Sequence, residues 1–254
     1  LADVSGLNAT LREVLENAAA MVAGLCRTRR KANACVLQPS IGLTALGATE
    51  GAAAPLIKAL RTREKEVTVF HANGFGGAAF ARFAGRGAFH TIIDLTPHEM
   101  TRVNIAGAHV PMPKRFSAAP DIPRIVLPRG LNFIGLGEAS LVPRRYLERP
   151  HYSHSGFFTH VKLTPGEMFE IAQTLAASLN ACTGPTRLIV PMGGFSHQDR
   201  PGGAIEDPAL RGVFLDTVRA ALKPRVRLDV VAAHISDPVV TDRILTSLTD
   251  LVPA

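Results

Sequence analysis

The sequence predicts an α/β protein with a doubly wound, mainly parallel sheet. Short apolar runs alternate with longer amphipathic stretches, which is the pattern of βαβ units. The runs are apolar almost throughout, as expected for strands that helices cover on both faces. About six or seven strands fit an open sheet. A closed TIM-like barrel would need eight strands and is the alternative.

The elements follow from apolar periodicity and from the residues that begin and end helices. An amphipathic helix over residues 7–25 opens the chain, with Asp3 or Ser5 as its cap. The basic run 27–31 suits the C-terminal end of that helix, where the dipole favours cations. The predicted strands cover residues 41–47, 67–71, 91–95, 124–128, 157–163, 187–193 and 226–234. The predicted helices after them cover residues 51–63, 76–87, 97–107, 164–184, 207–223 and 237–252.

Two of these helices have clear N-terminal signals. Thr164 and Glu167 form a capping box, and Asp207 is a cap followed by Pro208 in the first turn. No internal repeat or low-complexity linker interrupts the alternation. We therefore expect one α/β domain over residues 1–254.

Composition favours an enzyme or a small-molecule binding protein over a membrane or disulfide-rich protein. No apolar run approaches the roughly 18 residues of a membrane span, and no signal peptide is visible. The three cysteines form no CxxC pair, so we expect a cytoplasmic location. The formal charge of +7 suits an anionic ligand. Nucleic-acid binding is disfavoured, because the chain has no Trp, two Tyr and no aromatic residues among its basic clusters.

The carboxyl ends of parallel strands meet at one rim of a sheet, where open α/β sheets bind their ligands. Five of the predicted strands are followed there by glycines, hydroxyl groups, histidines and acids. The predicted ligand-binding residues at this rim are Gly47, Thr49, Asn73, Gly74, Gly76, Gly77, Gly193, Gly194, Ser196 and His197. The predicted catalytic residues are His71, Asp94, Glu99 and His234.

Residues 71–77 (HANGFGG) are the most informative part of that rim. Gly74-x-Gly76-x-x-Ala79 fits the dinucleotide fingerprint between a strand and a helix, and Asp94 stands where a ribose-binding acid would. Glycines allow close backbone approach, and a helix N-terminus offers N–H groups to an anion. The turn is predicted to hold a phosphate or a carboxylate, with a tight turn that binds nothing as the alternative.

Two further segments of the rim carry candidate chemistry. Residues 47–51 (GATEG) form a second anion nest or a helix cap. In residues 193–199 (GGFSHQD), the adjacent Ser196 and His197 do not face each other as a nucleophilic pair would. His197 or Asp199 is therefore predicted as an acid, a base or a polar ligand contact. The histidines and acids of the rim also suit a divalent metal, although none has diagnostic spacing.

The chain also resembles the C-terminal half of the Tm-one-like ATP-binding family of bacteria, fungi and plants, which includes a plant protein conferring resistance to a tobamovirus. The matching segments run in order and cover nearly the whole chain. They are DVSGLN (3–8), ENAAAMVAGL (16–25), IGLTALGAT (41–49), VFHANGFGG (69–77), IIDLTPHE (92–99), RGLNFIGLG (129–137), LNACTGPTRLIVPMGG (179–194) and HISDP (234–238).

The resemblance implies a Rossmann-like domain that is the second of two. It also implies that ATP or another nucleotide binds mainly to the N-terminal domain, in the same or a separate chain, and that the protein is a homo-oligomer. The first hypothesis is an enzyme subunit with hydrolase or lyase-type chemistry on a small anionic metabolite at the interdomain cleft. The alternatives are a nucleotide-responsive binding or regulatory module without catalysis, and an NAD-dependent oxidoreductase.

Overall fold

The computed structural model describes residues 8–32, 40–46, 50–107 and 114–251. The chain divides into two units, residues 1–38 and 39–254. In the first unit, helix α1 (Ala9–Ala32) extends beyond the predicted range. The second unit holds every strand described below. The prediction that residues 1–254 form one domain stays a prediction.

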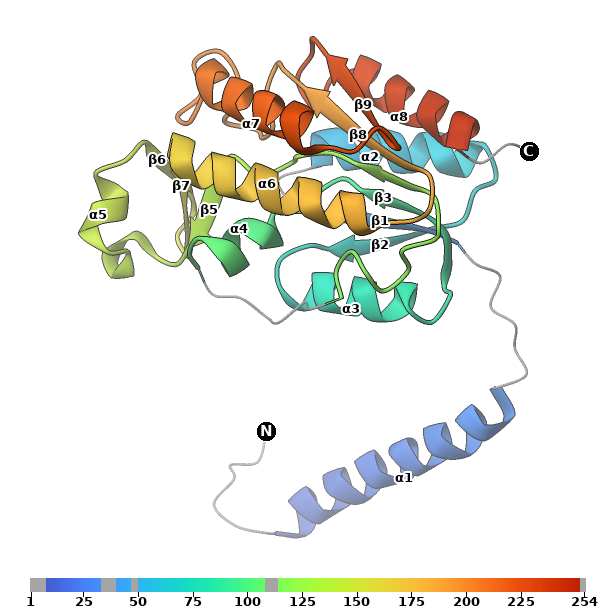
Figure 1. Ribbon diagram of the computed structural model, residues 1–254. Helices are drawn as coiled ribbons and strands as arrows, with labels where there is room; N and C mark the ends of the chain where they lie inside the picture. Colours follow the sequence, from blue (N-terminus) through green and yellow to red (C-terminus); the bar gives the residue numbers. More distant parts are fainter. Residues whose placement is uncertain (1–7, 33–39, 47–49, 108–113, 252–254) are drawn as a thin grey trace. The chain divides into compact units, whose positions relative to one another are not determined.

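The second unit contains the predicted doubly wound parallel sheet (Figure 1). Its six strands lie in the order β2-β1-β3-β4-β8-β9, and every neighbouring pair is parallel. The fold class read from the sequence is therefore confirmed, and the sheet is open rather than a barrel. The strands are β1 (Ser40–Ala45), β2 (Val67–His71), β3 (Phe89–Asp94), β4 (Arg124–Val126), β8 (Thr186–Pro191) and β9 (Val226–Val231).

Helices cover both faces of this sheet. Successive residues of a strand point to opposite faces, so a strand that is apolar throughout needs cover on both sides. Ile125 packs with α2 and α8, while its neighbour Val126 packs with α6 and α7. Phe80 of α3 packs against β3 in a smaller third cluster. The helices of the sheet are α2 (Glu50–Thr62), α3 (Phe75–Ala84), α4 (Glu99–Asn104), α6 (Pro165–Ala181), α7 (Pro208–Ala221) and α8 (Pro238–Leu251).

Helix boundaries follow the local sequence signals closely. Thr164 and Glu167 form the predicted capping box at the start of α6, and the Asp207 side chain accepts the N–H of Leu210 at the start of α7. Helix α4 begins at Glu99, two residues after Pro97, and His98 is its N-cap residue. Across the described residues, no helix combines the length and apolar character needed to cross a membrane.

The segment between β4 and α6 forms a second sheet that the sequence did not predict. Its strands are β5 (Phe133–Leu136), β6 (His151–Ser155) and β7 (Phe158–Lys162), with antiparallel order β5-β7-β6. The strand predicted over residues 157–163 is therefore not part of the main sheet. Only Gly156 and Phe157 separate β6 from β7, which is too short for a crossover and makes the pair a hairpin. A short 3-10 turn (Ala139–Leu141) and helix α5 (Arg144–Leu147) join β5 to β6.

Candidate functional site

The strand order places a topological switch point between β1 and β3. From β1 the chain crosses to the edge strand β2, and from β3 it crosses to β4 on the other side. Ligands of open α/β sheets bind outside the carboxyl ends of the strands at such a point. Two groups of buried polar side chains lie at this rim, one around Glu99 and one around Arg129.

The first group joins the glycine turn after β2 to the residues after β3. The backbone N–H groups of Gly74 and Gly77 both donate to Glu99 Oε1, the latter at 3.1 Å. Arg115 donates to the other oxygen of Glu99 and to Asp94 Oδ1 at 2.9 Å. The N-terminus of α3, which was predicted to bind an anion, therefore binds the carboxylate of Glu99 from the same chain.

Asp94, Glu99 and Arg115 form a buried ion-pair cluster, called the ion-pair lock below. Asp94, Glu99 and Arg115 are 2%, 1% and 7% exposed. Burial raises the pKa of Glu99, while Arg115 and the N–H groups of Gly74 and Gly77 oppose the rise. Asp94 also accepts from the Thr44 hydroxyl at 2.6 Å. Since both oxygens of Asp94 have partners within the chain, the geometry argues against a ribose contact there.

The glycines of the rim allow the chain to approach itself. A Cβ on Gly76 would lie 1.8 Å from His71 O, and one on Gly77 would lie 1.9 Å from Glu99 Oε2. Gly194 has φ of 143°, and its Cβ would lie 1.7 Å from Asp199 O. A side chain at any of these positions would displace backbone or a buried carboxylate. Close packing within the protein therefore explains why these positions are glycine, without any ligand.

The second group surrounds a narrow cavity of about 10 Å³, room for about one water molecule, at the carboxyl ends of β1, β4 and β8. It is lined by Leu46, Arg129, Gly130, Phe133, Tyr152, Ser196 and His197. Arg129 is only 2% exposed, and its Nη1 lies 3.5 Å from Ser236 Oγ. Burial lowers the pKa of Arg129 to about 10; Tyr152 opposes this effect and Arg200 adds to it. The guanidinium is therefore a buried hydrogen-bond donor in the wall of the cavity.

His197 adds a hydrogen-bond donor to this cavity. Arg200 Nη2 lies 2.8 Å from His197 Nδ1. A guanidinium only donates, so Nδ1 accepts and the ring hydrogen of the neutral imidazole is on Nε2. Burial, Arg200, Arg129 and His154 lower the pKa of His197, in that order of size. At neutral pH the ring is therefore uncharged and offers Nε2–H.

Ser196 and His234 are held by each other and by Asn132. Asn132 Nδ2 donates to Ser196 Oγ at 3.0 Å, and His234 Nε2 donates to Ser196 O at 2.9 Å. His234 Nδ1 accepts the N–H of Ser236 at 3.2 Å. Burial lowers the pKa of His234, and the hydrogen bond to Ser196 O is the largest effect that opposes this lowering. The Nε2 bond joins the loops after β8 and β9, and the Nδ1 bond stays within the loop after β9. With both ring nitrogens engaged, the geometry favours a positioning role over proton transfer.

Tyr152 is oriented by a stack of rings that sequence reasoning missed. Its hydroxyl lies 2.8 Å from His160 Nδ1, and His160 stacks on Phe133 with centroids 4.2 Å apart. Phe133 in turn lies 4.6 Å from His98, whose Nδ1 donates to Gly130 O at 2.7 Å. Burial raises the pKa of Tyr152 to about 12, so its hydroxyl keeps its proton at neutral pH. The second sheet therefore brings a fixed phenol to the cavity.

The structure brings together some of the predicted residues and separates others. Ser196 and His197 line the cavity and His234 lies behind it, whereas Gly74, Gly77, Asp94 and Glu99 belong to the ion-pair lock. His71 is exposed at the end of the edge strand, and Asn73 Oδ1 accepts from Arg102. A Cβ on Gly193 would lie 2.4 Å from Ala233 C. Gly47 and Thr49 lie outside the described residues.

Sequence reasoning missed Arg115 and Arg129 as members of these groups, although Arg129 opens the segment RGLNFIGLG that carries part of the resemblance. Each lies in an irregular loop, and each becomes buried only when distant strands assemble. Within residues 8–32, 40–46, 50–107 and 114–251, no group of three or more His, Cys, Asp or Glu side chains is placed to hold a metal ion. The use of a divalent metal stays a prediction.

Comparison with known proteins gives the family. Residues 38–252 match the domain described as the uncharacterised protein family (UPF0261) C-terminal domain. The chain belongs to this family. The match includes the whole parallel sheet and both polar groups at its rim.

The relatives of this UPF0261 chain are longer proteins. It is 30% identical over 243 residues to a UPF0261 protein of Brucella suis, covering 94% of this chain and 58% of the relative. It is 30% identical over 253 residues to one of Rhizobium meliloti, covering 98% and 63%. The ToMV resistance protein Tm-1(GCR237) of Solanum lycopersicum is 25% identical over 263 residues, covering 99% and 34%. The resemblance read from the sequence is confirmed, and the chain spans about three fifths of its bacterial relatives.

Proposed function

We propose that this domain is part of an enzyme that acts on a small anionic metabolite, with hydrolase or lyase-type chemistry, at the opening of the cavity around Arg129. One observation carries the proposal: a guanidinium that is 2% exposed lines a cavity at the carboxyl ends of the strands. The hydroxyl of Ser196 and the ring of His197 line the same cavity. A site with a buried cation and convergent donors suits a carboxylate or a phosphate.

The residues of the cavity have distinct proposed roles. Arg129 compensates the charge of the anion, and Ser196 and Tyr152 contribute hydroxyl groups that fix its orientation. His197 is the proposed hydrogen-bond donor to a developing oxyanion, because its Nε2–H is the donor left after Nδ1 accepts from Arg200, and the neutral ring donates this bond without giving up the proton. Such a donor would assist departure of an oxyanion leaving group.

The proposal also includes a further domain outside residues 1–254, and this part of it draws on the longer relatives. Because the bacterial relatives are longer than this chain, we propose that an N-terminal domain, in the same or a separate chain, binds ATP or another nucleotide. The cavity would then lie at the cleft between the two domains, in a cytoplasmic homo-oligomer. A divalent metal would arrive with the nucleotide phosphates, whose oxygens are ligands that Mg²⁺ prefers.

A regulatory module without turnover is the second candidate function. Three of the four predicted catalytic side chains, those of Asp94, Glu99 and His234, make hydrogen bonds or ion pairs within the chain. Groups engaged in this way hold a structure together and are poorly placed to exchange protons. On this alternative the same cavity binds an anion, and binding biases the contact with the nucleotide-binding domain.

Sulfate titration by calorimetry tests the site, and ester hydrolysis separates the two functions. We expect the Arg129→Met variant to bind sulfate at least about tenfold more weakly, whereas Arg63→Met, an exposed control, matches the parent. Ser196→Ala is a milder second variant, and circular dichroism verifies that each folds. Hydrolysis of p-nitrophenyl acetate or phosphate that Arg129→Met abolishes supports the enzyme. Sulfate binding without any turnover supports the regulatory module, and equal sulfate affinity in Arg129→Met contradicts both.

A further inference from the structure

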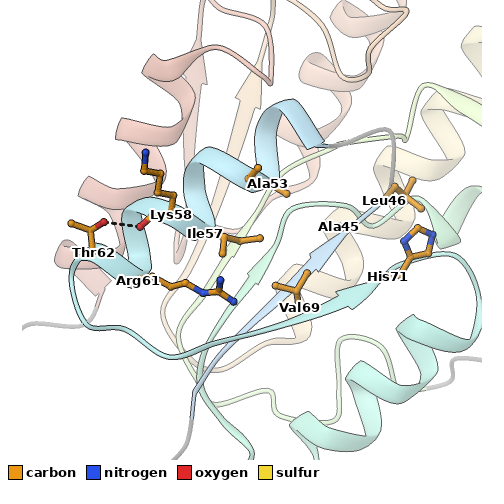
Figure 2. A pocket seen from close by; sticks show the side chains of 10 residues that line it. Ala45, Leu46, Ala53, Ile57, Lys58, Arg61, Thr62, Val69 and His71 are labelled. Carbon is orange, nitrogen blue, oxygen red and sulfur yellow. Dashed lines mark hydrogen bonds between the residues drawn. The ribbon is translucent and has the colours of Figure 1, made fainter.

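An open groove of about 850 Å³ lies between helix α2 and the edge strand β2, away from the Arg129 cavity (Figure 2). Its floor is apolar and includes Ala53 and Ile57 of α2 and Val69 of β2. Val69 is 41% exposed, which is high for an apolar side chain in a strand. Leu46 lies at one end of the groove and also lines the Arg129 cavity, and within the described part of the chain no other residue lines both.

Cationic side chains border this apolar floor. Lys58 and Arg61 are three residues apart on α2 and therefore lie on neighbouring turns of the same face. In Figure 2, the guanidinium of Arg61 extends toward Val69, and His71 lies beside Leu46 at the opposite end. Among the described residues that line the groove, none is acidic, and neither Lys58 nor Arg61 forms an ion pair with another described residue.

The groove is long enough to hold a small molecule. Its α2 wall runs from Ala53 to Thr62, which at the rise of an α-helix corresponds to roughly 14 Å. Its volume is within the range of roughly 300–1,000 Å³ that ligand pockets occupy. Burying Val69 and Ile57 beneath an apolar ligand would add hydrophobic stabilisation, and the cations of α2 would select a negatively charged end.

We propose that this groove binds an amphiphilic anion, a molecule with an apolar body of up to roughly 14 Å and one carboxylate, sulfonate or phosphate group. The apolar body lies on Ile57 and Val69, and the anionic group lies against Arg61, the cation that extends over the groove. The proposal concerns a different surface from the Arg129 cavity, so it does not rest on the function proposed above.

The absence of tryptophan from the sequence allows a site-specific test. The Val69→Trp variant puts a single indole on the groove floor, and Phe157→Trp puts one on the exposed β6–β7 turn as the control. The first ligand is 8-anilinonaphthalene-1-sulfonate, an aromatic sulfonate that accepts energy from tryptophan. We expect saturable binding, with efficient energy transfer in the Val69→Trp chain and weak transfer in the Phe157→Trp chain.

Competition then determines the charge of the ligand. Decanoate should displace the dye, whereas decyltrimethylammonium, an amphiphile of opposite charge, should not. Arg61→Glu should weaken decanoate binding at least about tenfold, and Arg63→Glu, a charge reversal just beyond α2, should leave it within about twofold. Both variants should keep the parent circular dichroism spectrum and melting temperature.

Four results would overturn the proposal. Equal displacement by the cationic amphiphile, or an unchanged affinity in Arg61→Glu, would mean that the groove is a general apolar surface suited to another protein. Failure of the dye to bind the full chain, or transfer that is no stronger in Val69→Trp than in Phe157→Trp, would mean that the groove does not take such ligands.

Discussion

Glu99 Oε1 accepts the backbone N–H of Gly77 at 3.1 Å, so a side chain from one crossover fills the helix N-terminus of another. Helix N-termini attract anions because their first N–H groups lack partners within the helix. Here that attraction is satisfied internally, and Arg115 balances the buried charge. The glycine turn therefore holds the segments after β2 and β3 together at the rim.

The close approach at Gly77 makes this position intolerant of any side chain. We expect Gly77→Ala to lower the free energy of unfolding by about 3 kcal/mol, because the new methyl group would overlap Glu99 Oε2 and Arg115 Nη1. Urea denaturation measures the change. The matched control is Gly212→Ala in α7, where a Cβ meets nothing within 4 Å and alanine should stabilise the helix by up to about 1 kcal/mol. Equal effects of the two substitutions would contradict the packing argument.

Asp207 should give the fold an acid-sensitive contribution. Burial acts to raise the pKa of its carboxyl group, but hydrogen bonds from Lys162 and from Leu210 N–H outweigh burial and lower it. A carboxylate whose folded pKa is depressed stabilises the protein above its unfolded pKa, and this stabilisation is lost as pH falls through the folded pKa.

The corresponding variant is Asp207→Asn, which keeps the helix cap but loses the charge. We expect the parent to be more stable than this variant by about 0.5–1 kcal/mol at pH 7, with the difference vanishing toward pH 2. Denaturant titrations at several pH values measure it. Asp216→Asn, on an exposed turn of α7, is the control and should show no comparable pH dependence. A difference that grows toward low pH would reverse the predicted sign.

His197 should respond to both of its basic neighbours. Its pKa lies below the ordinary value, through burial first and then through Arg200 and Arg129. We expect Arg200→Gln to raise this pKa, since the substitution removes a cation whose Nη2 lies 2.8 Å from the ring. Titration of the histidine ring protons by NMR measures the change. An unchanged pKa would show that the contact with Arg200 does not persist in solution.

Anion binding should be coupled to the same titration. An anion over Arg129 would raise the pKa of His197, so by linkage its affinity should increase as pH falls through that pKa. Sulfate is suited to this measurement because its charge stays constant between pH 5 and 8. The pH dependence should disappear in His197→Gln. A sulfate affinity that is independent of pH in the parent chain would place the anion away from His197.

His234 should prove to be a structural residue. Replacing it with alanine leaves Ser196 O and Ser236 N–H without their ring partner, so we expect a loss of about 1–3 kcal/mol in the free energy of unfolding. His234→Asn, which retains a donor and an acceptor, should recover part of this loss. Full stability of His234→Ala, together with complete loss of turnover on an active substrate, would instead assign it a catalytic role.

Elements that depend on neighbouring residues could be predicted from the amino-acid sequence. The alternation of apolar runs and amphipathic stretches predicted the parallel sheet, and Thr164, Glu167 and Asp207 marked the starts of two helices. The sequence also placed the polar residues at one rim, because every strand of a parallel sheet ends on the same side. These predictions succeed because periodicity and capping act within a few residues of the chain.

The partners of the rim residues could be seen only in the folded chain. Glu99 occupies the glycine turn through bonds that span 22 and 25 residues, and Arg115 and Arg129 become buried charges only after separate strands meet. The antiparallel sheet that brings Tyr152 to the cavity arises from one short turn at residues 156 and 157. Local sequence determines where a chain turns and which face is apolar. The partner of a buried charge depends on which distant segments pack together, because desolvation makes each such charge find a partner in the assembled fold.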